Sequence, residues 1–219
     1  IIIIIISLLL ISLAGCSTTK QRGKVTMRLN WTVTGVHAPY YLGLDKGYFK
    51  DEGIELQLMP GSGSGTTAQL VSNKSDTFGL VDAAAAIPLM AQGLPIKCVA
   101  MISPASSLAV IARKDSGIKT LKDLEGKTLA VTPGDSLTQT WPAVVAKNGL
   151  DAGKIKLVNV DAAAKIPAVL EKRADALLGS SADQNFTLQA QGVETVDLNF
   201  ASFGVNLLNL GIFAHPDTI

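Results

Sequence analysis

Small polar residues gather in four segments of this chain, each at the end of an expected strand and just before an expected helix. The four segments are residues 61–67, 81–82, 132–136 and 179–181. The N-terminus of a helix offers free N–H groups and a partial positive charge, and both favour the binding of anions. These segments therefore predict a site for a carboxylate, sulfonate or phosphate that needs no cluster of arginines. An alternative is that they only supply N-cap residues, which helices in general favour, namely Thr67, Asp82, Ser136 and Ser181.

The first segment contains an alternation of glycine and serine at residues 61–65. Capping alone does not require three glycines, so this loop is the better evidence for a backbone that approaches a ligand closely. The loop lacks the Gly-Lys-Ser/Thr ending of a nucleotide P-loop, and Thr66 stands where the G-x-G-x-x-G motif has its last glycine. It therefore matches neither of the two nucleotide-binding motifs.

Aromatic side chains near strand ends or helix starts offer a surface on which a flat ligand can stack. We expect Trp31 and His37 to border the ligand site, and Trp141 to lie near it. The alternative for these residues is packing in the core or between domains. Tyr48 and Phe49 are expected in the core.

Residues 134–137, Gly-Asp-Ser-Leu, spell the nucleophile block of GDSL-type esterases. Those enzymes carry the serine near the first strand and an Asp-x-x-His motif near the C-terminus. Here Ser136 lies in the middle of the chain and the sequence has no Asp-x-x-His. His37 and His215 are the only histidines, and neither has metal-ligand spacing around it. We predict no catalytic residue, no metal and no cofactor, and keep a hydrolase as an alternative.

Alternating strands and helices must position these residues. Residues 25–31 alternate apolar and polar side chains, as a half-buried strand does. Tyr41, Leu44 and Tyr48 recur at helical spacing and predict an apolar stripe that faces a sheet. Residues 54–58 alternate again as the next strand. Such a β-α-β unit is parallel and right-handed, and ligands bind outside the carboxyl ends of its strands.

The same order of strand, loop and helix repeats along the chain and predicts an α/β protein. We expect two lobes, each a mostly parallel sheet flanked by helices. Residues 24–113 would form lobe 1, a polar hinge at 114–120 would lead into lobe 2 at 114–200, and residues 201–219 would cross back to lobe 1. The ligand would lie in the cleft between the lobes, which closes by a hinge motion. The predicted ligand-binding residues are Trp31, His37, Gly63, Ser64, Gly65, Thr66, Asp82, Ser106, Thr132, Ser136, Trp141 and Ser181.

The N-terminal segment has the pattern of a bacterial lipoprotein signal. Residues 1–13 are an apolar run without charge, followed by the small residues before Cys16 and then by polar residues. We predict a signal peptide at 1–15, lipidation of Cys16, and a polar leash at 16–23 that tethers the protein to a membrane surface of the cell envelope. The alternative is an ordinary N-terminal anchor helix with an incidental cysteine.

Composition restricts the function classes further. Hydrophobic residues make up 47% of the chain and the net charge is +1, which excludes a disordered protein and a nucleic-acid-coating protein. We expect a monomer with no nucleic-acid partner. Cys98 alternates with Ile96 and Ala100 and is expected to be buried in a strand. The absence of an initial Met and the end shortly after a strand predict a fragment.

Residues 29–58 carry a resemblance to a known family. They resemble the first segment of the solute-binding proteins of ABC importers in the nitrate, taurine and alkanesulfonate group, which includes binding proteins for the pyrimidine precursor of thiamine. The matches are Asn-Trp at 30–31, Lys-Gly-Tyr-Phe at 46–49 and Glu-Gly at 52–53. His37 stands six residues beyond Trp31, as in the pyrimidine-precursor members. Residues 33–34 and 38–39 depart from the Pro-Asn and Thr-Gly of those members.

The resemblance covers nearly all of residues 25–219. It implies the two-lobed periplasmic-binding-protein type II fold, truncated at the C-terminus. It also implies a lipoprotein that captures a small anionic or heteroaromatic solute and delivers it to a permease and an ATPase, without catalysis. The alternatives are an enzyme on a related scaffold, similar either to a pyrimidine-precursor synthase or to a GDSL-type esterase, and a lipid-anchored ligand-sensing domain. Such synthases carry a Cys-rich motif, and this chain lacks one.

Overall fold

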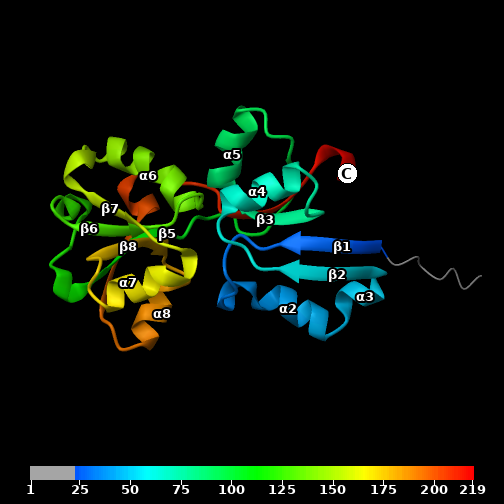
Figure 1. Ribbon diagram of the computed structural model, residues 1–219, viewed down its shortest axis with the longest axis horizontal. Helices are drawn as coiled ribbons and strands as arrows, with labels where there is room; N and C mark the ends of the chain where they lie inside the picture. The colour runs from blue at the N-terminus through cyan, green and yellow to red at the C-terminus, as the bar shows by residue number, and fades with distance from the viewer. Residues whose placement is uncertain (1–22) are drawn as a thin grey trace, which may run out of the picture.

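The computed structural model describes residues 23–219, which form two lobes side by side (Figure 1). The predicted signal peptide at 1–15, the lipidation site Cys16 and most of the leash at 16–23 lie outside the described residues and stay predictions. Within residues 23–219, no helix combines the length and the apolar character that crossing a membrane requires.

The first lobe is built on a five-stranded sheet with the order β2-β1-β3-β10-β4. Its strands are β1 (Gly23–Arg28), β2 (Ile54–Met59), β3 (Phe78–Asp82), β4 (Lys97–Met101) and β10 (Leu210–Ala214). Its helices are η1 (Gly35–His37), α2 (Ala38–Asp45), α3 (Tyr48–Asp51), α4 (Ser64–Ser72), α5 (Ala83–Ala91) and η7 (Pro216–Thr218).

The second lobe has a five-stranded sheet with the order β7-β6-β8-β5-β9. Its strands are β5 (Leu108–Arg113), β6 (Thr128–Val131), β7 (Lys156–Asn159), β8 (Ala176–Ser180) and β9 (Thr195–Asn199). Its α-helices are α6 (Ser136–Lys147), α7 (Lys165–Leu170) and α8 (Gln184–Ala190). Short 3-10 helices complete it: η2 (Lys114–Ser116), η3 (Leu121–Leu124), η4 (Ala152–Lys154), η5 (Ala162–Ala164) and η6 (Phe200–Phe203).

In each sheet, a single strand runs against the other four. Strand β10 is antiparallel to both β3 and β4, and β5 is antiparallel to both β8 and β9. The remaining neighbours, β1 with β2 and β3 and β6 with β7 and β8, are parallel. Both antiparallel strands come directly after a crossing from one lobe to the other. The predicted α/β fold with two mostly parallel sheets is therefore confirmed, with one reversed strand in each sheet.

The boundary between the lobes differs from the prediction. Residues 108–113 were expected in the first lobe, but β5 pairs between β8 and β9 in the second. The first crossing is therefore residues 102–107, and the polar segment 114–120 is a surface turn. The second crossing is residues 204–209, because Phe200 is fully buried in the second lobe's core.

The predicted apolar stripe on the first long helix is wrong. Tyr48 is 62% exposed and Tyr41 is 38% exposed, so neither faces the sheet. The left-handed Gly47 ends the helical period, and Tyr48 starts the separate helix α3. Tyr40 packs on the sheet instead, against the first lobe's inner core.

Cys98 is exposed, and so is every residue of β4, contrary to the expected buried strand. The physical reason is the position of β4 at the edge of the sheet, where β10 is its single neighbour among residues 23–219. An alternating pattern alone does not distinguish an edge strand from a central one.

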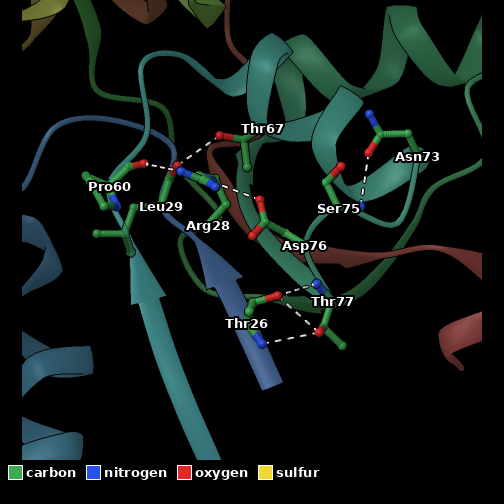
Figure 2. Close-up of polar contacts among 9 residues, drawn as sticks. All are labelled: Thr26, Arg28, Leu29, Pro60, Thr67, Asn73, Ser75, Asp76 and Thr77. Carbon is green, nitrogen blue, oxygen red and sulfur yellow. Dashed lines mark hydrogen bonds and ion pairs between the residues drawn. The ribbon is translucent and has the colours of Figure 1, made fainter. Parts of the chain in front are cut away.

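A buried ion pair ties together the segments that leave the first sheet toward the cleft (Figure 2). The Arg28 Nε donates to Asp76 Oδ2 at 2.8 Å, and its Nη1 donates to the carbonyl of Pro60 at 3.0 Å. Thr67 Oγ1 donates to the carbonyl of Leu29 at 2.9 Å. These bonds join the ends of β1 and β2 to α4 and to the turn before β3, so the loop after β1 has a fixed starting point.

Substitution of Asp76 tests this framework. The side chains of Arg28 and Asp76 are 22% and 3% exposed, so Asp76→Ala leaves a largely buried guanidinium without its counter-charge. We expect the free energy of unfolding to fall by roughly 2–3 kcal/mol, measured by urea denaturation. Asp51→Ala removes an exposed carboxylate and should change it by less than about 0.5 kcal/mol. Equal stability of the two variants would contradict a structural role for the pair.

Candidate functional site

A cavity of about 240 Å³ lies between the two lobes and receives side chains from both. From the first lobe it is lined by Asn30, Trp31, Thr34, Val36, Tyr40, Ser64 and Asp82. From the second lobe it is lined by Asp135, Ser136, Leu137, Lys165, Ser180, Asp183 and Gln184. The crossing segments add Ile102, Ser103, Ser107 and Asn209. The arrowheads of β1 and β2 point toward the second lobe (Figure 1), and the loop after β1 supplies Asn30 and Trp31, so the cavity lies outside the carboxyl end of β1.

Four of the predicted ligand-binding residues line this cavity: Trp31, Ser64, Asp82 and Ser136. Trp31 comes from the loop after β1, and Ser64 is the first residue of α4. Asp82 ends β3 and caps α5, while Ser136 opens α6 from the opposite lobe. Side chains that are far apart in the sequence thus meet at the ends of strands and the starts of helices, as expected for this kind of fold.

His37 lies behind the cavity and positions a residue that lines it. The imidazole is fully buried, and its Nδ1 accepts the N–H of Thr34 at 3.1 Å. The ring proton is therefore on Nε2, which donates to Asn30 Oδ1 at 3.0 Å. Burial lowers the pKa of His37, so the imidazole is neutral at neutral pH. This bond holds the carbonyl side of Asn30 and leaves its amide N–H groups for a ligand.

Gly63 and Gly65 contact the other lobe, and neither of them lines the cavity. The N–H of Gly65 donates to the carbonyl of Gly134 at 2.9 Å, across the two lobes. A Cβ on Gly63 or on Gly65 would lie 2.8 Å from that same carbonyl oxygen. Thr66 is exposed, and its hydroxyl lies beside Gly134. The glycines therefore permit close approach of a second backbone, and the N–H of Gly65 is already taken.

Trp141 belongs to the core of the second lobe. It is 5% exposed, and its ring centroid lies 6.2 Å from that of Phe200. Core packing, the alternative stated for this residue, is therefore correct.

Three further predicted residues make hydrogen bonds away from the cavity. Thr132 donates to the carbonyl of Val160 at 3.0 Å within the second lobe. Ser181 donates to Asp197 at 2.9 Å in the same lobe. In the first crossing, Ser106 accepts the N–H of Leu108 at 3.2 Å. These bonds give each hydroxyl a local structural role.

Sequence reasoning missed Lys165, which is the centre of the contact between the lobes. Its Nζ lies 2.7 Å from Asp135 Oδ2, and the two side chains are 1% and 3% exposed. The same Nζ lies 4.7 Å from the centroid of the Trp31 ring, which belongs to the first lobe. Burial lowers the pKa of Lys165, while Asp135 opposes this shift. The available signal was a single charge at the start of the apolar helix α7.

Protein carboxylates cap two of the helix N-termini that were predicted to bind an anion. Asp82 Oδ1 accepts the N–H of Ala84 at the start of α5, at 2.9 Å. Asp135 Oδ1 accepts the N–H of Thr138 at the start of α6, at 2.6 Å. Asp183 is the N-cap residue of α8, but its side chain makes no capping hydrogen bond. At the starts of α5 and α6 these N–H groups are therefore already bonded, and the N-cap alternative is correct for Asp82.

Asp82 is the most perturbed carboxyl of the cleft. Burial raises its pKa from 3.8 to about 6, and the charge of Asp135 across the cleft adds to the shift. Hydrogen bonds from the N–H of Ala84 and the hydroxyl of Ser136 act in the opposite direction. Ser136 lies in the other lobe, so the ionisation of Asp82 is coupled to the contact between the lobes.

A family model described as NMT1/THI5 like matches residues 34–219 of this chain. The 4-amino-5-hydroxymethyl-2-methylpyrimidine phosphate synthase of Schizosaccharomyces pombe is 32% identical over 107 residues, which are 48% of this chain and 31% of that protein. A putative thiamine biosynthesis protein of Haemophilus influenzae is 24% identical over 171 residues, 78% of this chain and 54% of that protein. The chain thus spans about a third to a half of the length of these relatives.

Solved structures share the fold. The alkanesulfonate-binding protein SsuA of Xanthomonas axonopodis pv. citri, bound to MOPS, superimposes with a TM-score of 0.70 at 16% identity, over 90% of this chain and 67% of that chain. An ABC uptake transporter substrate-binding protein of Streptococcus pneumoniae with bound histidine gives a TM-score of 0.66 at 17% identity, over 92% and 82% of the two chains. This likeness establishes the two-lobed periplasmic-binding architecture.

The raised pKa of Asp82 predicts how stability depends on pH. Between about pH 3.8 and pH 6, the folded protein binds more protons at Asp82 than the unfolded chain does, so this group destabilises the fold as pH rises. Asn at this position keeps the cap without the charge. We expect Asp82→Asn to gain up to roughly 3 kcal/mol of unfolding free energy relative to the native protein between pH 4 and pH 7. Urea titrations at both pH values measure this difference.

The matched control is Asp161→Asn, which neutralises an exposed carboxylate outside the cavity. Its stability relative to the native protein should not vary over the same pH range. A constant difference for Asp82→Asn as well would show that Asp82 titrates normally.

Proposed function

The chain belongs to the NMT1/THI5-like family, and from this premise we propose that it is the solute-binding component of an ABC importer. It captures a small solute between its lobes and delivers the solute to a permease driven by an ATPase. The observation that carries the proposal is the cavity, which side chains from both lobes line. The solved solute-binding proteins with the same architecture support it.

Closure of the cleft is the proposed mechanism, and no covalent step is involved. The crossings at residues 102–107 and 204–209 join the lobes and serve as the hinge. In the closed form the contacts between the lobes include the N–H of Gly65 on Gly134, Lys165 over Trp31, Ser136 beside Asp82, and Thr34 beside Asp183. A solute that contacts both lobes stabilises this form over the open one.

We propose that the body of the solute is flat and small. Trp31 and Tyr40 supply aromatic surface to the cavity, and Asn30 is held so that its amide faces inward. A ring stacked on Trp31 would contribute about 0.5–1.5 kcal/mol beyond the burial of its area. A heteroaromatic solute, one of the two classes implied by the sequence, suits these groups.

An enzyme remains the second candidate, because the fungal relatives are named synthases. Those matches cover under a third of each synthase, so their activity is not carried over to this chain. A GDSL-type esterase would need a histidine beside Ser136. His37 is bonded to Thr34 and Asn30, and His215 accepts the N–H of Asp217 near the end of the chain, so neither lines the cavity.

Binding without turnover is the first test of this proposal. The complete protein is titrated by calorimetry with MOPS, histidine and 4-amino-5-hydroxymethyl-2-methylpyrimidine, and each ligand is then recovered for mass spectrometry. We expect one of these classes to bind and to be recovered unchanged. Recovery of a chemically altered ligand would establish the enzyme instead.

Closure is tested with a matched pair of glycine variants. A Cβ at residue 65 would lie 2.6 Å from Gln139 Nε2 and 2.8 Å from the carbonyl oxygen of Gly134, so Gly65→Ala should hold the lobes apart. Gly23→Ala meets no atom within 4 Å. We expect Gly65→Ala to weaken binding of the best ligand by at least about tenfold and Gly23→Ala to leave it unchanged. Equal affinities would show that binding does not require this closed form.

Anchoring to the cell envelope through a lipid on Cys16 is part of the proposal, supported by the lipoprotein pattern of residues 1–16. Cys16→Ser removes the thiol that carries the lipid, so we expect the protein to move from the membrane fraction to the soluble fraction. Cys98→Ser is the control, because its thiol lies on β4 of the first lobe. A Cys16→Ser protein that stays with the membrane would overturn the lipid anchor.

A further inference from the structure

The charges that line the cleft are unevenly matched. Three carboxyls line it, from Asp82, Asp135 and Asp183, and Lys165 supplies the ammonium group. Lys165 is paired with Asp135 at 2.7 Å. Among residues 23–219, no cationic side chain forms a salt bridge with Asp82 or Asp183. The cleft therefore offers negative charge that the protein itself does not neutralise.

Several backbone N–H groups that an anion could use are already engaged. The N–H groups of Ala84 and Thr138 are bonded to the carboxylates that cap their helices. The N–H of Gly65 is bonded to the other lobe, and the N–H of Asp82 is bonded to Ser64 Oγ at 3.0 Å. An anionic solute would have to displace these acceptors while it approached uncompensated carboxyls.

Lys165 already demonstrates the kind of group that the cleft accepts. Its ammonium lies between the carboxylate of Asp135 and the face of Trp31. A carboxylate together with an aromatic face is a favourable environment for an organic cation, through charge pairing and the cation–π interaction. The second lobe thus fills one such position with its own side chain.

A further acceptor set lies next to this position. Asp183 faces the cavity from the start of α8, and one of its oxygens accepts from Gln184 Nε2 at 2.5 Å. Across the cleft, the hydroxyl oxygen of Thr34 is buried and faces the Asp183 carboxyl, whose pKa is raised by burial and lowered by this hydroxyl. The two side chains present a polar pair to the cavity, one from each lobe.

We propose that the solute of this cleft is an organic cation with a flat body, held at its charged end by Asp183 and Asp82 and along its face by Trp31. The proposal rests on the solute-binding function proposed above and specifies the charge of the solute. It separates this chain from the alkanesulfonate-binding protein that shares its fold, whose bound MOPS carries a sulfonate.

The test uses three benzene derivatives: benzamidinium, a flat cation; benzamide, which is neutral and of nearly the same shape; and benzenesulfonate, an anion with a tetrahedral head. Each is titrated into the complete protein by calorimetry at neutral pH. We expect benzamidinium to bind at least about tenfold more tightly than benzamide, because a charge-assisted hydrogen bond is stronger than a neutral one. Benzenesulfonate should bind most weakly.

Matched variants locate the charge recognition. Asp183→Asn should weaken benzamidinium binding by about ten- to one-hundredfold and leave benzamide unaffected. Asp161→Asn removes the same charge from an exposed position outside the cavity and should leave both affinities unchanged. The melting temperature of each variant without a probe shows whether the variant is folded. If Asp183→Asn melts at a markedly lower temperature than the native protein, Asp82→Asn is used in its place. Equal weakening by the cleft and control variants would overturn recognition within the cleft.

The remaining outcomes distinguish a failure of the proposed cationic solute from a failure of the proposed solute-binding function. Tighter binding of benzenesulfonate than of benzamidinium would overturn the cationic solute and leave solute binding intact. A best ligand without a positively charged group, found with the MOPS, histidine and pyrimidine panel, would do the same. Failure of every probe in both panels would overturn the solute-binding function and this inference with it.

Discussion

The burial of the Lys165 ammonium beside Asp135 and beneath Trp31 is the interaction on which the closed arrangement depends. Removing two charges from water costs several kcal/mol for each ion, and their attraction compensates for this only when the geometry is good. The ion pair belongs to the second lobe, but the aromatic ring that covers it belongs to the first. Opening the cleft returns the pair to water and removes the ring. The two forms therefore differ by opposing terms, and a bound solute can decide between them.

Precise placement of Trp31 requires a rigid first lobe. The carbonyl of Trp31 accepts the N–H of Gly61 at 3.0 Å, and the carbonyl of Leu29 accepts the hydroxyl of Thr67. A Cβ on Gly61 would lie 1.9 Å from the Leu29 carbonyl oxygen, so the two loops can approach this closely only with glycine there. The Arg28–Asp76 pair fixes the strand ends beneath them. The aromatic wall of the cleft is therefore set by backbone contacts on one side of the hinge.

The local sequence pattern predicted the strands and helices well. It predicted less well which segments contact each other in the folded protein. The alternation around Met27 and the strand-end position of Asp82 identified real strands, because side-chain direction follows directly from backbone geometry. The prediction that residues 108–113 belong to the first lobe was wrong. An apolar strand pattern predicts that a strand is buried, but it does not predict which strands lie beside it. Trp141 and Trp31 look alike in sequence, yet one packs on Phe200 and the other faces Lys165. Lys165 was missed because its partners come from distant segments.

The position of β10 has a consequence for how the chain folds during synthesis. The second lobe is a continuous segment from Leu108 to Phe203, so all its strands are synthesised before β10. The first lobe is discontinuous, because β10 lies between β3 and β4 in its sheet and joins β4 to the other strands. Domains generally fold as units while the chain emerges. The lobe that is synthesised first therefore completes its fold last, after the second lobe has brought the chain back to it.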